Sequence, residues 1–482
     1  MSRMRFGTSL VGLSLLVLCL GSAGCKNRNK TLAPVTVGGD VVTTNVEGDA
    51  RSAKVWDQVE RLVLGDGLLV HWLPEAEAAR LHLRLLIPTE SGRTPLPAAQ
   101  LNILANAMRE QLALRTRGLH VRVSVHPAPG RIEVSLRGDT KDTERIFGAL
   151  GRAMGSEPGT KVFEGLLTRE LADHKRLDAG EAASSALLST LLELPREHLA
   201  SSRAEVQALS ANELRKSWRA FVNPREAVLV VHGEGTPASA EPALNKLSDA
   251  WRAPGPSLSA PSESALERLQ PHRARTARRK PKSHEDHLIL GQPAAPLGFV
   301  DALELKPNRA IVAIGRVIPT PTAKERALAR LAQRLIAQDA DLRLVVAGPI
   351  SVLILRARVA GSDPEASLAK AVSKLESYAT STFAANRIQQ AARLWLGARV
   401  VAAALEDEDW TMLYSEALDL ADSDEDATHS LARDALFMLE VQPDELTAFT
   451  SKWFAPKSGE PGWAWRIAGA DENMATKLAA LR

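Results

Sequence analysis

The segment Leu81-His-Leu-Arg-Leu-Leu-Ile-Pro-Thr89, together with the helical pattern over residues 96–114, decides the fold. Apolar and polar residues alternate over residues 81–87, which is typical of a half-buried strand. Over residues 96–114 the apolar residues recur at helical spacing, so one face is apolar: Leu101, Leu104, Ala105, Met108 and Leu112. The segment therefore predicts a strand followed by a helix that packs on it.

The same order recurs in the second half of the chain. A strand pattern over residues 309–317 ends in Ile318-Pro-Thr320, just as the first ends in Ile87-Pro-Thr89, and a helical pattern over residues 322–338 follows. Strands at 342–347 and 350–359, helices over 364–451 and a strand near 463–468 complete this half. The shared order predicts a duplicated architecture.

The rest of the first half alternates strand and helix patterns. Residues 61–73 predict two strands joined by a Gly-Asp-Gly turn, and further strands are expected at 119–125, 131–136 and 227–231. Helices are expected at 140–154, 160–176, 181–193 and 210–221, the last beginning with the capping pattern Ser210-Ala-Asn-Glu213. Residues 51–252 and 288–482 are thus predicted to be two α+β domains.

Two segments are poor in periodic patterns. Residues 25–50 are polar and predict a flexible stalk. Residues 253–287 hold five prolines and the basic run 272–282, and they predict a linker between the domains. The basic run is interpreted as solvated linker rather than as a contact with anionic lipid headgroups.

The N-terminus has the layout of an export signal. Arg3 and Arg5 precede an uncharged apolar stretch over residues 10–20, and small residues 21–24 lead into Cys25. The apolar stretch is shorter than the roughly 20 residues that span a bilayer. The segment resembles a bacterial lipoprotein signal, which implies cleavage after residue 24 and lipid on Cys25. By the rule of that family, Lys26 favours the outer membrane, with the protein facing the periplasm.

Cysteine usage and charge limit the possible functions. Cys19 leaves with the signal, so Cys25 alone remains and no internal disulfide can form. The whole chain has 60 basic and 57 acidic residues, a net charge of +3. This balance and an aromatic content of 4% argue against a nucleic-acid binder, which needs a concentrated basic face.

Several segments in order resemble the M16 peptidases, the insulinase and mitochondrial-processing-peptidase family. Residues 65–70, 134–146 and 163–171 resemble its opening strand pair, the strand and helix after its catalytic helix, and the helix of its third zinc ligand. Residues 209–214 and 221–233 resemble the stretch that closes each domain. The resemblance implies two LuxS/MPP-like domains, each a helix-covered mixed or antiparallel sheet, that face each other as a clamshell.

Activity in that family needs His-x-x-Glu-His on the first long helix, because two histidines four residues apart bind one zinc and the glutamate activates its water. The helix over residues 96–112 has no histidine, and the motif occurs nowhere in the chain. Glu170 fits the family's third ligand, but without imidazoles it is interpreted as a helix-surface carboxylate beside Arg169. Glu110, the only carboxylate of the first helix, also lacks partners.

The second half departs from the active pattern as well. Active members carry an arginine and a tyrosine there that hold the substrate backbone, and the matching stretch over residues 342–352 has no tyrosine. The glycine-rich loop of non-catalytic processing-peptidase subunits is also missing. The resemblance therefore implies a pseudoenzyme with no catalytic residue and no zinc.

Other candidate sites are weaker. His284-Glu-Asp-His287 lies at the end of the linker, and His120 and His126 are about 20 Å apart along one strand, too far for one metal. His82 and His232 lie within apolar strands and are interpreted as structural. The acidic runs 406–409 and 422–426 are explained by loops and helix starts rather than by calcium.

Three functions remain open on the sequence. The first is a lipid-tethered, non-catalytic M16-like protein that pairs with an active zinc peptidase or captures peptides, because family members often work as an active and an inactive half. The second is a zinc peptidase with a displaced site, and the third is a scaffold of the cell envelope.

Overall fold

The computed structural model describes residues 59–75, 78–89, 96–128, 130–173, 179–191, 201, 203–252, 264–269, 299–300, 310–320, 322–338, 340–347, 350–405, 411, 414–415, 418, 437–455, 463–469, 474 and 477. The signal, Cys25, the stalk, the pair His284 and His287 and both acidic runs lie outside these residues. Within them, no helix combines the length and the apolar character that a membrane crossing requires.

The first sheet has six strands in the order β1-β2-β6-β3-β5-β4. Only the β2–β6 pair is parallel. The strands are β1 (Glu60–Val63), β2 (Leu69–Pro74), β3 (Arg80–Pro88), β4 (Arg122–Ala128), β5 (Arg131–Asp139) and β6 (Val228–Gly233). Along β5 the even-numbered residues are buried and the odd-numbered ones are half-buried, so at this strand one face of the sheet is apolar and the other is polar.

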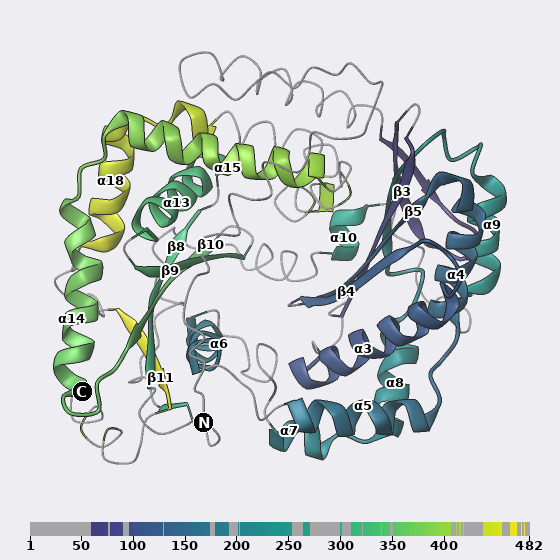
Figure 1. Ribbon diagram of the computed structural model, residues 1–482, viewed down its shortest axis with the longest axis horizontal. Coiled ribbons are helices and arrows are strands. Elements are labelled where there is room, and N and C mark those ends of the chain that lie inside the picture. The colour runs from purple at the N-terminus through teal and green to yellow at the C-terminus, as the bar shows by residue number, and fades with distance from the viewer. Residues whose placement is uncertain are drawn as a thin grey trace, which may run out of the picture. The chain divides into compact units, whose positions relative to one another are not determined.

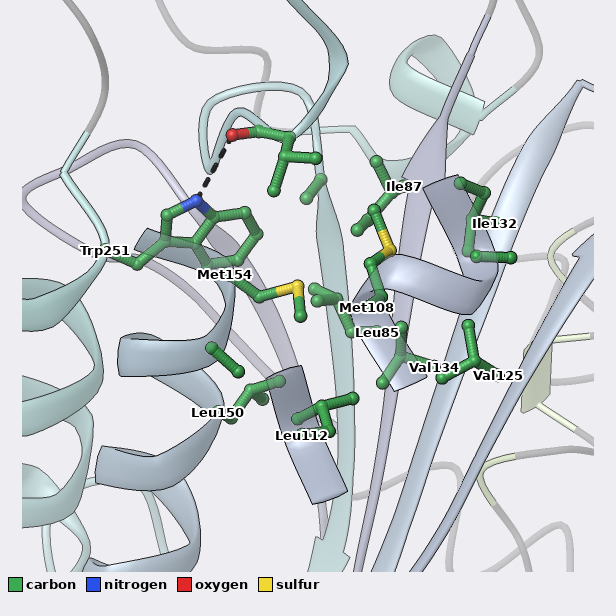
Figure 2. Close-up of a cluster of buried hydrophobic side chains, with 14 of the residues drawn as sticks. Leu85, Ile87, Met108, Leu112, Val125, Ile132, Val134, Leu150, Met154 and Trp251 are labelled. Carbon is green, nitrogen blue, oxygen red and sulfur yellow. Dashed lines mark hydrogen bonds between the residues drawn. The ribbon is translucent and has the colours of Figure 1, made fainter. Parts of the chain in front are cut away.

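Helices cover the apolar face of the first sheet. They are α3 (Ala98–Arg115), α4 (Thr143–Gly155), α5 (Thr160–Asp173), α7 (Arg203–Ala208), α8 (Ala211–Phe221) and α9 (Glu241–Ala250), with a short 3-10 turn, η1 (Thr140–Asp142), before α4. Figure 2 shows the core between them, where Met108 and Leu112 of α3 meet Leu85 of β3. Trp251 closes this core, and its indole nitrogen donates to the Val222 carbonyl at 3.3 Å.

The second sheet has five strands in the order β7-β11-β8-β10-β9, of which only β7 and β11 pair in parallel. The strands are β7 (Phe299–Val300), β8 (Ile311–Pro319), β9 (Asp341–Ala347), β10 (Ile350–Arg358) and β11 (Ala464–Ala468). Its core lies under α13 (Ala323–Ile336), α14 (Pro364–Ser377), η4 (Tyr378–Thr380), α15 (Ala385–Leu405) and α18 (Pro443–Phe454). Figure 1 shows α13, α15 and α18 gathered beside β8 and β10.

The two sheets repeat one topology. The order β6-β3-β5-β4 of the first sheet corresponds to β11-β8-β10-β9 of the second, and a helix follows the equivalent strands β3 and β8. Thr89 and Thr320, which end the two Ile-Pro-Thr segments, are both buried. The repeated architecture that the sequence predicts is therefore present.

Helix α6 (Ala179–Leu191) belongs to the first half by sequence but packs on the second sheet. Its buried residues contact β8, β10 and β11. Glu181 at its start accepts from Arg343 at 2.8 Å and Arg356 at 3.0 Å, and Thr190 near its end accepts from Arg466 at 2.7 Å. The second sheet is therefore covered on one face by its own helices and on the other by α6.

The second face of the first sheet is also covered, at the end that holds β2 and β6. The short helix α10 (Ala265–Leu269), which lies inside the predicted linker, packs there. Arg268 donates to the carbonyls of Gly67 and Ala227, both at 2.9 Å, and burial lowers its pKa to about 10. From the second half of the sequence, Tyr414 joins the same apolar cluster. Segments of each half thus cover a sheet of the other.

The α+β fold of two helix-covered sheets, predicted from the sequence, is confirmed. The expected capping box at Ser210 is present, because the Ser210 hydroxyl accepts from the Glu213 N–H and the Glu213 carboxylate accepts from the Ser210 N–H. A second capping box, between Thr322 and Glu325, begins α13.

Candidate functional site

Helix α3 occupies the place of the family's catalytic helix, after β3. Its half-exposed polar residues Asn102 and Asn106 are four apart and share one face, with Ala105 between them. This is the spacing of His-x-x-Glu-His, with amides where the motif has imidazoles and a methyl group where it has the carboxylate. Zinc sites in proteins use cysteine, histidine and carboxylate ligands, so this helix does not fit zinc.

The neighbouring helix α5 carries Glu170, the residue expected at the third-ligand position. Glu170 shares a stripe with the buried residues Phe163 and Leu166, and it is half-buried rather than fully exposed. The next residue back, Arg169, forms an ion pair with Glu110 of α3. The two helices are therefore joined by a charge pair one turn beyond Asn106.

Strand β4 lies beside this face of α3 and, among the strands that the structure describes, forms one edge of the first sheet. Arg109 of α3 connects the two elements: its guanidinium donates to the Asn106 side-chain oxygen at 2.5 Å and to the Val125 carbonyl at 2.6 Å. A strand at a sheet edge has backbone N–H and C=O groups without a ladder partner. We infer that the Val125 carbonyl belongs to this outward-facing row.

Pro127 supports the same assignment of the edge. Proline has no N–H to donate, and within a sheet it occurs where that position faces away from the neighbouring strand. Pro127 is exposed and lies two residues after Val125, so both residues direct their backbone to the same side. Sequence reasoning missed this edge, although Pro127 in an alternating segment is the signal that identifies it.

The polar face of β3, β5 and β4 carries a network around Glu133. Its carboxylate accepts from Arg84 at 3.0 Å and pairs with Arg131 at 2.5 Å. Burial raises the pKa of Glu133, but the positive charges and hydrogen bonds of Arg131 and Arg84 outweigh burial, so its pKa lies below the usual value. The ionised carboxylate is therefore the stable form in the folded protein.

Replacing Glu133 by glutamine is expected to lower the free energy of unfolding at neutral pH by about 1.5–3 kcal/mol, the usual contribution of hydrogen bonds to charged groups. Because the folded-state pKa is depressed, this contribution is present above the unfolded-state pKa and is lost as the pH falls through the folded-state value. Urea unfolding of both proteins at neutral and acidic pH measures the difference. The exposed Glu164→Gln variant is the control, and a Glu133→Gln effect that does not shrink in acid would contradict the assignment.

The buried histidines form a separate group. His82 and His232 lie directly opposite each other on β3 and β6, and the His232 ring nitrogen Nε2 is 3.1 Å from the Glu75 carboxylate. His71 shares a 3.0 Å hydrogen bond with the Tyr414 hydroxyl. Among the described residues, no group of three or more histidine, cysteine or acidic side chains has a metal-binding arrangement. His120 and His126 are both exposed; His120 lies two residues before β4, and His126 lies within it.

In the second half, residues 342–352 are the stretch that the sequence resemblance compares with the substrate-holding segment of active family members. They include most of β9 and the start of β10, which pair antiparallel with Val345 opposite Val352. The stretch holds Arg343, which donates to Glu181 of α6 at 2.8 Å. Its one arginine is thus used in holding α6 on the second sheet.

Similarity to known proteins is found in the three-dimensional structure and not in the sequence. No protein-family model and no curated protein matches the sequence. A crystal structure of a peptidase M16 inactive domain from Pseudomonas fluorescens is 14% identical, with a TM-score of 0.59 over 86% of this chain and 98% of that one.

Two further solved structures are about twice as long as this chain. The periplasmic protease PqqL from Escherichia coli is 12% identical, with a TM-score of 0.59, and the match covers 86% of this chain and 45% of PqqL. The ferredoxin protease FusC, solved in complex with Arabidopsis ferredoxin, is 12% identical, with a TM-score of 0.55, over 88% of this chain and 50% of FusC. The resemblance found in the sequence is therefore confirmed in three dimensions: the chain has the fold of the M16 peptidases, and one of the structures that share this fold is an inactive domain.

Proposed function

We propose that this protein is a non-catalytic M16-like protein that binds extended polypeptide segments along the edge of β4. The observation that carries the proposal is the position of this edge. It lies beside the face of α3 that has the spacing of the zinc motif but carries Asn102, Ala105 and Asn106. This face of α3 offers no imidazole, and the edge beside it offers outward-facing backbone groups to an extended peptide, among them the Val125 carbonyl, which also accepts from Arg109.

An incoming peptide would add a seventh strand to the first sheet. Main-chain hydrogen bonds to a sheet edge provide affinity in this mode, and alternate side chains provide selectivity. The residues of β4 whose backbone N–H and C=O groups face away from β5 are Val123 and Val125, in alternation with Pro127. Pro127 has no N–H, so the row of donors ends there. FusC, with the same fold, has been solved with a protein bound, which supports a role in polypeptide binding.

Replacing Val123 by proline tests the proposal. Proline removes the N–H at position 123, which faces outward because it alternates with Val125, so the variant is expected to lose peptide binding while β4 still pairs with β5. The measurement is fluorescence anisotropy of a labelled unfolded peptide against the full chain, with Ser124→Ala as the matched control.

The peptide itself gives a second test that does not depend on how the variant folds. N-methylation of alternate peptide residues removes their donors and is expected to weaken binding to the unaltered protein at least tenfold. Equal binding of methylated and unmethylated peptides, or full binding by the proline variant, would rule out strand addition at β4.

We further propose that the protein acts in the periplasm, held on the outer membrane by lipid on Cys25. The signal pattern before Cys25 supports this, and PqqL, which has the same fold, is periplasmic. Cys25→Ala is expected to move the protein from the membrane to the soluble fraction, and Lys26→Asp to retain it in the inner membrane. Unchanged fractionation of both variants would overturn the proposed anchor.

An active partner subunit is the second candidate function. The match covers 45% of PqqL and 50% of FusC, and the part of each protein that lies outside the match supports the proposal of a second subunit beside this fold. Such a partner would carry an intact His-x-x-Glu-His. Affinity purification from solubilised membranes that recovers no protein with this motif would count against the partner role while leaving the peptide-binding role intact.

A further inference from the structure

The surface next to the β4 edge is strongly basic. Between Asn106 and Ala128 the chain has four arginines, all exposed, and one carboxylate: the arginines are Arg109, Arg115, Arg117 and Arg122. The carboxylate is Glu110, which is already paired with Arg169. Among the described residues, no carboxylate forms an ion pair with any of these four arginines. The helix end, the connecting turn and the edge strand therefore carry uncompensated positive charge.

The polar face of the sheet adds to this charge. Arg122 of β4 lies directly opposite Arg137 of β5. Like charges in this position of an antiparallel pair are destabilising. Farther along the same face, Arg84 and Arg131 both contact the carboxylate of Glu133.

We propose that the β4 edge selects extended segments that bear aspartate or glutamate at alternate positions. This inference rests on the proposed function and specifies its ligand. In a strand added to β4, every second side chain would lie on the same face of the sheet as Arg122. A carboxylate at such a position would be close enough to the Arg122 guanidinium to form an ion pair. Carboxylates there would pair with the exposed Arg122, and the exposed Arg109 lies at the edge itself.

A peptide fits this surface better than a nucleic acid does. The backbone groups at Val123 and Val125 alternate donors and acceptors at the spacing of another strand. Base-stacking platforms need aromatic side chains, and the segment between Asn106 and Ala128 has none. The arginines attract an acidic ligand, and the backbone groups of the β4 edge can pair only with those of an extended polypeptide.

The test compares three labelled peptides of one length in which valine alternates with glutamate, glutamine or lysine. Binding to the full, unaltered chain is measured by fluorescence anisotropy at low and at high salt. The glutamate peptide is expected to bind about tenfold more tightly than the glutamine peptide at low salt, as a few exposed ion pairs would provide. High salt is expected to remove most of this preference.

Variants then locate the preference. Arg122→Glu is expected to abolish the advantage of the glutamate peptide and to improve binding of the lysine peptide, whereas Arg122→Gln should give an intermediate result. Arg152→Glu, at an exposed arginine on α4, is the matched control and is expected to leave the preference unchanged.

The outcomes separate the two proposals. Equal affinity for the glutamate and glutamine peptides overturns the selection of acidic segments but leaves strand addition in place. Failure of all three peptides to bind overturns both proposals. A preference for glutamate that survives Arg122→Glu overturns the assignment to β4, and a preference lost in that variant alone supports it.

Discussion

Replacing Leu187 by alanine is expected to lower the free energy of unfolding by about 2–5 kcal/mol, the usual cost of removing a fully buried leucine side chain. Leu187 lies in α6, and its exposed fraction is 0%. It packs against β8 at Gly315, where an added Cβ atom would lie 3.0 Å from Leu187 Cδ2 and 2.5 Å from the Leu353 carbonyl. Because Gly315 has no side chain, Leu187 packs directly against the backbone of β8. Truncation of Leu187 would therefore leave a cavity at this point.

The location of the loss matters as much as its size. Because α6 covers the second sheet, amide hydrogen exchange should accelerate in β8 and β10 rather than only near α6 itself. Leu394→Ala, at a leucine that is 52% exposed on α15, is the matched control and should change stability by less than about 0.5 kcal/mol. If Leu187→Ala were as mild as this control, α6 would not hold the second sheet.

Replacing both Asn102 and Asn106 by histidine is expected to create a zinc site on α3. The two imidazoles would share one face of α3, four residues apart, and Glu170 on the inward stripe of α5 would supply a carboxylate. We expect the variant to retain about one zinc per chain after dialysis. It should not hydrolyse peptides, because Ala105 supplies no general base.

Two further variants make this expectation specific. Asn102→His alone provides a single imidazole and should retain far less zinc than the double variant. Adding Glu170→Gln to the double variant should weaken retention, because it removes the third ligand. A folded double variant that holds no more zinc than the unaltered protein would show that α3 and α5 are not arranged like the family's zinc helices.

Local patterns predicted most of the elements. The alternation in β5, the apolar stripe of α3 and the capping box at Ser210 depend on neighbours within a few residues, so the sequence contains them directly. The strand β3 was also predicted, but it is buried on both faces rather than half-buried, because segments distant in sequence cover its second face. The repeat of strand, Ile-Pro-Thr and helix predicted that the sheets share a topology, because it preserves element order. Glu170 could be assigned to its helix for the same reason.

Long-range pairing could not be predicted in this way. The pattern of α6 shows that it has a buried face but not that the face packs on a sheet formed over a hundred residues later. The short helix α10 was not predicted, because the residues around it are rich in proline. It is held by hydrogen bonds from Arg268 to the carbonyls of Gly67 and Ala227, which are distant in sequence. Asn102 and Asn106 carry no metal signature, so only their place on α3 identifies them.

We propose that this chain does not assemble the zinc centre of the M16 peptidases, because α3 provides no imidazole. The most direct measurement is the zinc content of the full chain after it has been washed with a chelator and then equilibrated with a small excess of zinc and dialysed. The account predicts far less than one zinc per chain and no hydrolysis of unfolded peptides. One tightly held zinc per chain, together with peptide cleavage that a chelator abolishes, would contradict it.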